Sequence, residues 1–195
     1  MTGKYDGVHA FVFLREGDEV SPGAVIENLQ RYINRQAGPV FFASRFEGDF
    51  QGFAHIAGDD ARALGTFVGG DLWEAGIHSH NATEGQWHVN GHNQTMGPTR
   101  NTPSFIAICR VTVNQRPLLV MGNIASFFGD ELDAYGQSQS PFIGASTVIA
   151  DFHLLVELGD DDPEALSRHV QSLSRVDGVV GVEAAVAGTE ATPAA

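Results

Sequence analysis

Two stretches of the chain share one plan, and this internal repeat constrains the fold more than any other feature. Residues 53–85 and 154–188 each contain a strand-like run, Gly-Asp-Asp, a helix-like run, a glycine, and a second strand-like run that closes on glycine. Three glycines recur roughly one hundred residues further on: Gly58, Gly76 and Gly85 correspond to Gly159, Gly178 and Gly188. The sequence therefore predicts two units built alike.

The front part of the first unit has clear signals for strands and a helix. Residues 7–14, "GVHAFVFL", are rich in β-branched and aromatic side chains, which favours a strand. Ser21 and Pro22 suit the cap and the first position of a helix, which we expect to end at Gly38. Residues 40–58 then predict a hairpin around Gly48-Asp49.

The second half has the same order of signals. Residues 104–113, "SFIAICRVTV", predict a strand, and a helix is expected from Leu118 to about Tyr135. The apolar set of this expected helix consists of Leu119, Ile124, Phe127, Phe128 and Leu132. The last helix begins at Asp162-Pro163. Its predicted inner face consists of Leu166, Val170, Leu173 and Val176.

Each half is thus a βαββαβ unit of the ferredoxin-like kind. Such a unit covers one sheet face with helices and leaves the other face open, so two units in one chain are expected to pack their antiparallel sheets together. We predict an α+β protein with the following parts: a first unit over 1–90, a linker over 91–103, a second unit over 104–188 and a flexible tail over 189–195.

This tandem arrangement resembles the dimeric α/β-barrel superfamily. The stretch 151–188, with its strand, acidic helix start and final Gly-Val strand, is also similar to the effector-binding module of Lrp/AsnC-type regulators. The resemblance implies a tandem of such modules without a DNA-binding domain, and a role in ligand binding. It also admits the cofactor-poor oxygenases, isomerases and heme-linked enzymes of the superfamily.

Charge and composition exclude several partners. The net charge is −13 and no basic patch occurs, so binding to nucleic acid is not expected. The sequence contains no run of 18 apolar residues, so a membrane span is not expected. One cysteine, Cys109, permits no internal disulfide, and the first residues show no secretion signal. We therefore expect a cytoplasmic protein.

Histidines and aromatic residues alternate along the predicted strands of the first unit. His9, Phe11 and Phe13 share one face of the first strand, and Phe53 and His55 share one face of the third. His78 and His80 do so on an expected fourth strand, and the ferredoxin-like strand order brings all three strands together. We predict a ligand pocket there, away from the helices. His88 and His92 are instead expected to be solvated linker residues.

The spacing His78-x-His80 puts two imidazoles on the same side of a strand, so with His55 they could bind a transition metal such as zinc. The second half adds polar residues to apolar runs: Arg110, Asp151, His153 and Glu183. We include Arg110 among the ligand-binding residues. Whether these side chains face an interior or solvent depends on strand register, which the sequence leaves open.

Three functions compete. The first is a protein, expected to be a homo-oligomer, that binds or senses a small molecule, with or without a metal. The second is an enzyme on the same scaffold, with a pocket histidine as general base or metal ligand. The third is an assembly protein whose sheet faces serve only for packing. An enclosed cavity beside His9 and His55 would favour binding.

Overall fold

The computed structural model describes the larger part of the chain, in two compact units. The described residues are 8–14, 22–33, 40–58, 85–88, 94–96, 103–129, 140–148 and 151–188. The first unit extends to His92 and the second runs from Asn93 to Pro193. Both units combine helices with antiparallel strands, so the predicted α+β class is confirmed. Among the described helices, none is long and apolar enough to cross a lipid bilayer.

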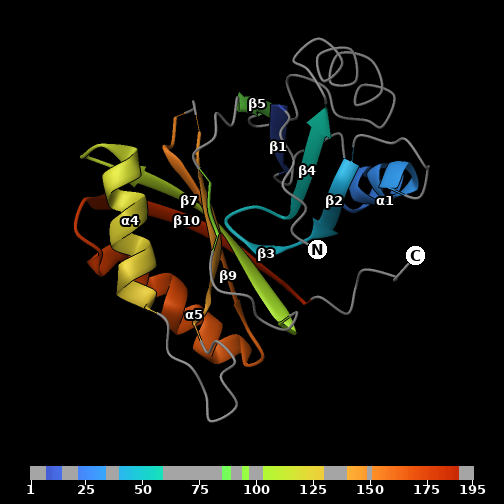
Figure 1. Ribbon diagram of the computed structural model, residues 1–195. Helices are drawn as coiled ribbons and strands as arrows, with labels where there is room; N and C mark the ends of the chain where they lie inside the picture. Colours follow the sequence, from blue (N-terminus) through green and yellow to red (C-terminus); the bar gives the residue numbers. More distant parts are fainter. Residues whose placement is uncertain are drawn as a thin grey trace. The chain divides into compact units, whose positions relative to one another are not determined.

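The first unit contains a four-stranded antiparallel sheet and a helix beside it (Figure 1). Its elements are β1 (Val8–Leu14), α1 (Pro22–Ile33), β2 (Val40–Arg45), the short β3 (Glu47–Gly48), β4 (Gly52–Gly58) and β5 (Gly85–His88). The strands lie in the order β2-β4-β1-β5. This is the ferredoxin-like order, because β1 lies in the middle of the sheet between β4 and β5.

Helix α1 identifies the two faces of this sheet. Its Ile26 and Leu29 are buried, and its Gln30 Nε2 donates to the Ala43 carbonyl of β2 at 3.0 Å. Arg45 of β2 forms an ion pair with Glu27 of α1. Residues paired across a ladder point to one face, and Ala43 is paired with Ala54 and Arg45 with Gly52. The face with Phe53 and His55 therefore points away from α1, and we name it the helix-distal face of the first unit.

The fourth strand of the first unit lies further along the chain than predicted. The strand paired with β1 is Gly85–His88, whereas we expected it at 77–80. His88, expected to lie in a linker, belongs to this strand instead, and His92 lies outside the described residues. The glycine correspondence does not hold here, because β5 begins at Gly85 whereas the last strand of the second unit ends at Gly188.

The second unit has the predicted βαββαβ order. Its elements are β6 (Gln94–Met96), β7 (Phe105–Val113), α4 (Pro117–Phe128), β8 (Phe142–Thr147), β9 (Leu154–Asp160), α5 (Pro163–Ser172), a short 3₁₀ turn (Leu173–Arg175) and β10 (Val179–Gly188). Within the unit the strands follow the order β10-β7-β9-β8-β6, again with the ferredoxin-like arrangement of four. Strand β6 lies in the segment predicted as a linker and extends the sheet beside β8.

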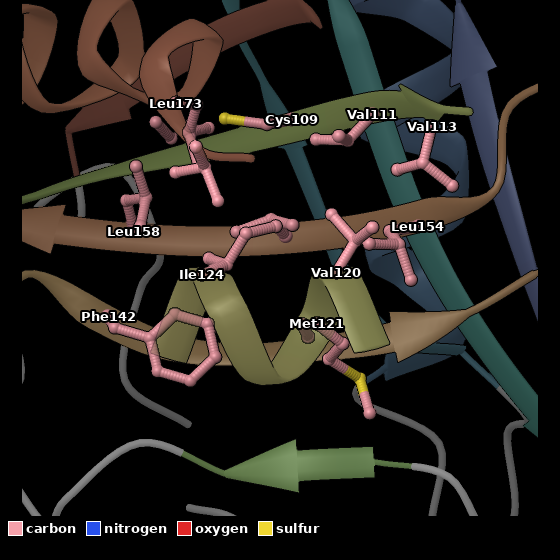
Figure 2. Packing of buried hydrophobic residues seen from close by; sticks show 14 of the residues in the cluster. Cys109, Val111, Val113, Val120, Met121, Ile124, Phe142, Leu154, Leu158 and Leu173 are labelled. Carbon is pink, nitrogen blue, oxygen red and sulfur yellow. The ribbon is translucent and has the colours of Figure 1, made fainter. Parts of the chain in front are cut away.

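Helices α4 and α5 cover one face of the sheet of the second unit (Figure 2). Alternate residues of β7 and β9, such as Cys109 and Val156, pack against Val120 and Ile124 of α4 and Leu166 of α5. Helix α5 is capped as predicted, since the Asp162 side chain accepts from the Glu164 N–H at 2.9 Å and Pro163 is the first helical residue. The predicted burial of Leu166, Leu173 and Val176 is also confirmed.

Helix α4 differs from its prediction in length and orientation. It ends at Phe128, because Gly129 takes φ 58° and its N–H bonds back to the Ala125 carbonyl. Leu119 and Phe127, two members of the apolar set expected for this helix, are 54% and 47% exposed. Val120 and Met121 face the core in their place, together with Ile124, which belonged to the expected set. Leu132 of the predicted apolar set lies outside the described residues.

Candidate functional site

Phenylalanine side chains cover the helix-distal face of the first unit. Phe11, Phe13 and Phe53 are buried there. The Phe13 and Phe53 rings are 5.3 Å apart between centroids, and Phe11 stacks on Phe53 at 6.1 Å. Phe46 and Phe50, just after β2 and before β4, continue the cluster, with Phe50 edge-on to Phe13 at 5.0 Å. The predicted grouping of these side chains on one face agrees with the register of β1 and β4.

His55 supplies the polar group of this aromatic surface. It is paired with Phe11 across the β1·β4 ladder, and the two rings lie 4.9 Å apart at an angle of 36°. Unlike the phenylalanines, His55 is only half-buried. The same face includes Ser44, which is buried opposite Phe53 on β2. Among the described ring-bearing residues of this face, His55 is thus the most accessible.

The remaining histidine predictions have different outcomes. The backbone register places His9 of β1 opposite Ala57 of β4 on one side and opposite His88 of β5 on the other. His78 and His80 lie outside the described residues. Within the described ranges no three His, Cys, Asp or Glu residues are grouped so that they could hold a metal ion. The zinc site of His55, His78 and His80 therefore stays a prediction.

The register of the second unit places Arg110 on the sheet face that points away from α4 and α5, which we name the helix-distal face of the second unit. Its neighbour Cys109 points into the helix-covered core. Arg110 is only 4% exposed. Its guanidinium lies 4.7 Å from the centre of the Phe152 ring and forms ion pairs with Asp151 at 2.9 Å and with Glu183 at 3.2 Å. His153 has a backbone role, since its Nδ1 accepts from the Val113 N–H at 3.2 Å.

Sequence reasoning missed two polar residues on this second face. Glu157 lies on β9 between the buried core residues Val156 and Leu158, so it points away from the helices. Burial raises the pKa of its carboxyl above the ordinary value of 4.5. Ser146 of β8 is buried on the same face. The signal was present, because Glu157 is the one charged residue in the apolar run "LLVELG".

No family model matches the sequence, and no curated protein matches it either. Solved structures do match. A proposed monooxygenase from Lactobacillus acidophilus NCFM has a TM-score of 0.52 at 8% identity, over 92% of each chain. An anthrone oxidase-like protein has a TM-score of 0.52 at 13% sequence identity, and the match covers 98% of this chain and 97% of that protein. A proposed Dyp-type peroxidase from Shewanella oneidensis has a TM-score of 0.53 at 10% sequence identity, and the match covers 95% of this chain and 94% of that protein.

At identities this low, the likeness speaks for the fold and not for the activity. It spans both units and agrees with the α+β architecture and the antiparallel sheets described above. This chain therefore shares the α+β fold of these proteins, which is the fold expected from its resemblance to the dimeric α/β-barrel superfamily.

Proposed function

We propose that the protein binds a small, flat, largely apolar organic molecule at the helix-distal face of the first unit, with His55 as its polar contact. The observation that carries this proposal is the position of His55, half-buried and 4.9 Å from the Phe11 ring at the margin of a buried phenylalanine cluster.

The chemistry of this surface selects the ligand class. Aromatic side chains give large contact area and favour stacked or edge-on rings, whereas a single polar group fixes orientation. An imidazole can both donate and accept a hydrogen bond. A planar ring system with one hydroxyl or carbonyl group would satisfy both features. The net charge of −13 disfavours strongly anionic ligands.

A titration with 1-naphthol and naphthalene tests this proposal, because the two probes differ only in a hydroxyl group. We expect the wild type to bind 1-naphthol about tenfold more tightly, the value of one good hydrogen bond. His55→Ala should remove that preference. His169→Ala is the matched control, since His169 is also a half-buried histidine beside a phenylalanine, Phe128, but in the second unit. A His55→Ala protein that keeps the preference would contradict the proposal.

An oxidative enzyme is the second candidate, because the solved structures with this fold include a proposed monooxygenase and an anthrone oxidase-like protein. In that case His55 would act as general base and take a proton from the bound ring system before its reaction with oxygen. Oxygen consumption with anthrone as probe tests this function. His55→Gln should lower the rate by 10²- to 10⁴-fold, roughly the contribution of a general base. His169→Gln should leave it unchanged.

A further inference from the structure

The carboxyl of Glu157 is the least explained polar group of the second unit. Its strand neighbours Val156 and Leu158 are fully buried in the helix-covered core, so Glu157 projects from the helix-distal face. Across the ladders it is paired with Ile108 of β7 and with Gly144 of β8. Some of its surface remains accessible, so the residue can be reached from outside.

Within the described part of the chain, no hydrogen bond or ion pair involves the side-chain carboxyl of Glu157, whose residue joins the two ladders through its backbone alone. The nearest cation by register is Arg110, which is paired with Leu155 and is therefore diagonal to Glu157. That guanidinium is already engaged by two carboxylates, Asp151 and Glu183. Burial without a compensating partner disfavours the charged carboxylate, which is why the pKa of Glu157 is raised.

The surroundings of Glu157 combine apolar residues with one hydroxyl group. Ile108, Leu155 and Ala185 are buried on the same face. Ser146, paired with Leu155 on the neighbouring strand β8, is 8% exposed and lies diagonal to Glu157. Two oxygen-bearing side chains, one half-buried and one buried, thus occupy diagonal positions among buried apolar residues. Such an arrangement is typical of a site for a ligand with a polar head and an apolar body.

We propose that Glu157 and Ser146 form a second binding site, distinct from the His55 surface, for the ammonium group of a small primary amine with an apolar body. An ammonium group has three donors and no acceptor, which matches one carboxylate and one hydroxyl oxygen. Charge favours the same class: Asp151 and Glu183 outweigh the single positive charge of Arg110, so an added carboxylate is repelled and an added cation attracted.

Binding has a defined proton balance. The amine arrives as R–NH₃⁺, and a neutral Glu157 carboxyl must release its proton to solvent to form the ammonium–carboxylate pair. Among the described residues, the other charged groups on this face are Arg110 of β7, Asp151 before β9 and Glu183 of β10, which already neutralise one another in part. Proton release should therefore follow the occupancy of Glu157.

Calorimetric titration with benzylamine, benzyl alcohol and benzoate tests the site. We expect benzylamine to bind the wild type, benzyl alcohol to bind at least tenfold more weakly and benzoate not to bind. At a pH below the raised pKa, the binding heat should change with the ionisation enthalpy of the buffer, which reports the released proton. Glu157→Gln should weaken benzylamine binding at least tenfold and abolish the buffer dependence, and Ser146→Ala should weaken binding several-fold.

Glu164→Gln is the matched control, because Glu164 of α5 is 86% exposed. Equal binding of benzylamine to Glu157→Gln and wild type would overturn the site, as would benzoate binding as well as benzylamine, or no benzylamine binding to the wild type. If Glu157→Gln fails to fold, Ser146→Ala and the selectivity of the wild type decide. His55→Ala should keep benzylamine binding, so failure of the first site is separable from failure of this one.

Discussion

Arg110 donates from Nη2 to both carboxylate oxygens of Asp151, at 3.0 and 2.9 Å, across 41 positions of sequence. Its Nη1 reaches Glu183 of β10 at 3.2 Å, and its charge lies 4.7 Å from the centre of the Phe152 ring. One buried guanidinium thus connects β7, the segment before β9, and β10. Because both acidic partners are about half-exposed, the cation is the member of this network whose desolvation matters most.

Replacement of Asp151 should destabilise the second unit. Asp151→Ala removes a two-bond contact and leaves the buried Arg110 with less compensation, so we expect a loss of roughly 1–3 kcal/mol in the free energy of unfolding. Arg110→Met in the Asp151→Ala background should restore part of the loss, since the uncompensated charge is gone. Urea denaturation measures both effects, with Glu164→Ala as an exposed control. An unchanged denaturation midpoint for Asp151→Ala would show that the network contributes nothing to the free energy of unfolding.

Stability should depend on pH through Glu157. Its pKa is raised in the folded state, so the folded protein holds this proton more tightly than the unfolded chain. The stabilisation is fully present below the ordinary pKa of 4.5 and is lost as pH rises through the raised value. Glu157→Gln cannot ionise, so its stability relative to wild type should increase over that pH range. Paired denaturation curves of the two proteins measure this difference, and a constant difference would contradict the prediction.

Replacement of two aliphatic residues on α4 should change the stability by very different amounts. Leu119 is 54% exposed, whereas Ile124 is fully buried against β7 and β9. Leu119→Lys should change the free energy of unfolding by at most about 0.5 kcal/mol, and Ile124→Ala should cost roughly 2–5 kcal/mol. Thermal unfolding of the two variants distinguishes the faces. Comparable losses would mean that the outer face of α4 is covered in the folded protein.

The sequence predicted the second unit well because its signals are local. Asp162 and Pro163 begin α5 as expected, and Gly178 was recognised as a repeat glycine. The structure explains that glycine, since its φ is 91° and a Cβ there would lie 2.5 Å from Val120 Cγ2. On the first sheet, the period of two along β1 and β4 was sufficient to group Phe11, Phe13, Phe53 and His55 on one face.

The errors arose where the outcome depends on tertiary packing or on strand pairing and not on local sequence signals. An apolar helix such as α4 has little contrast between its faces, so Leu119 and Phe127 could not be distinguished from Val120 and Met121 by type alone. The strand beside β1 was placed at His78 and His80 by alignment with the second half, although only the ladder shows that Gly85–His88 is the partner. Glu157 was missed because its burial depends on the strand register, which a single charged residue in an apolar run does not reveal.

The metal prediction can be tested without knowledge of the ligand. If His55, His78 and His80 bind zinc, the purified protein should contain about one transition metal ion per chain. Added zinc should then raise the melting temperature, because metal binds the folded state. His78→Ala and His80→Ala should each lower the metal content, with His169→Ala as control. The register offers His9 and His88 as a second histidine pair, so His9→Ala and His88→Ala belong in the same series. Metal-free protein whose melting temperature is unaffected by zinc would exclude both assignments.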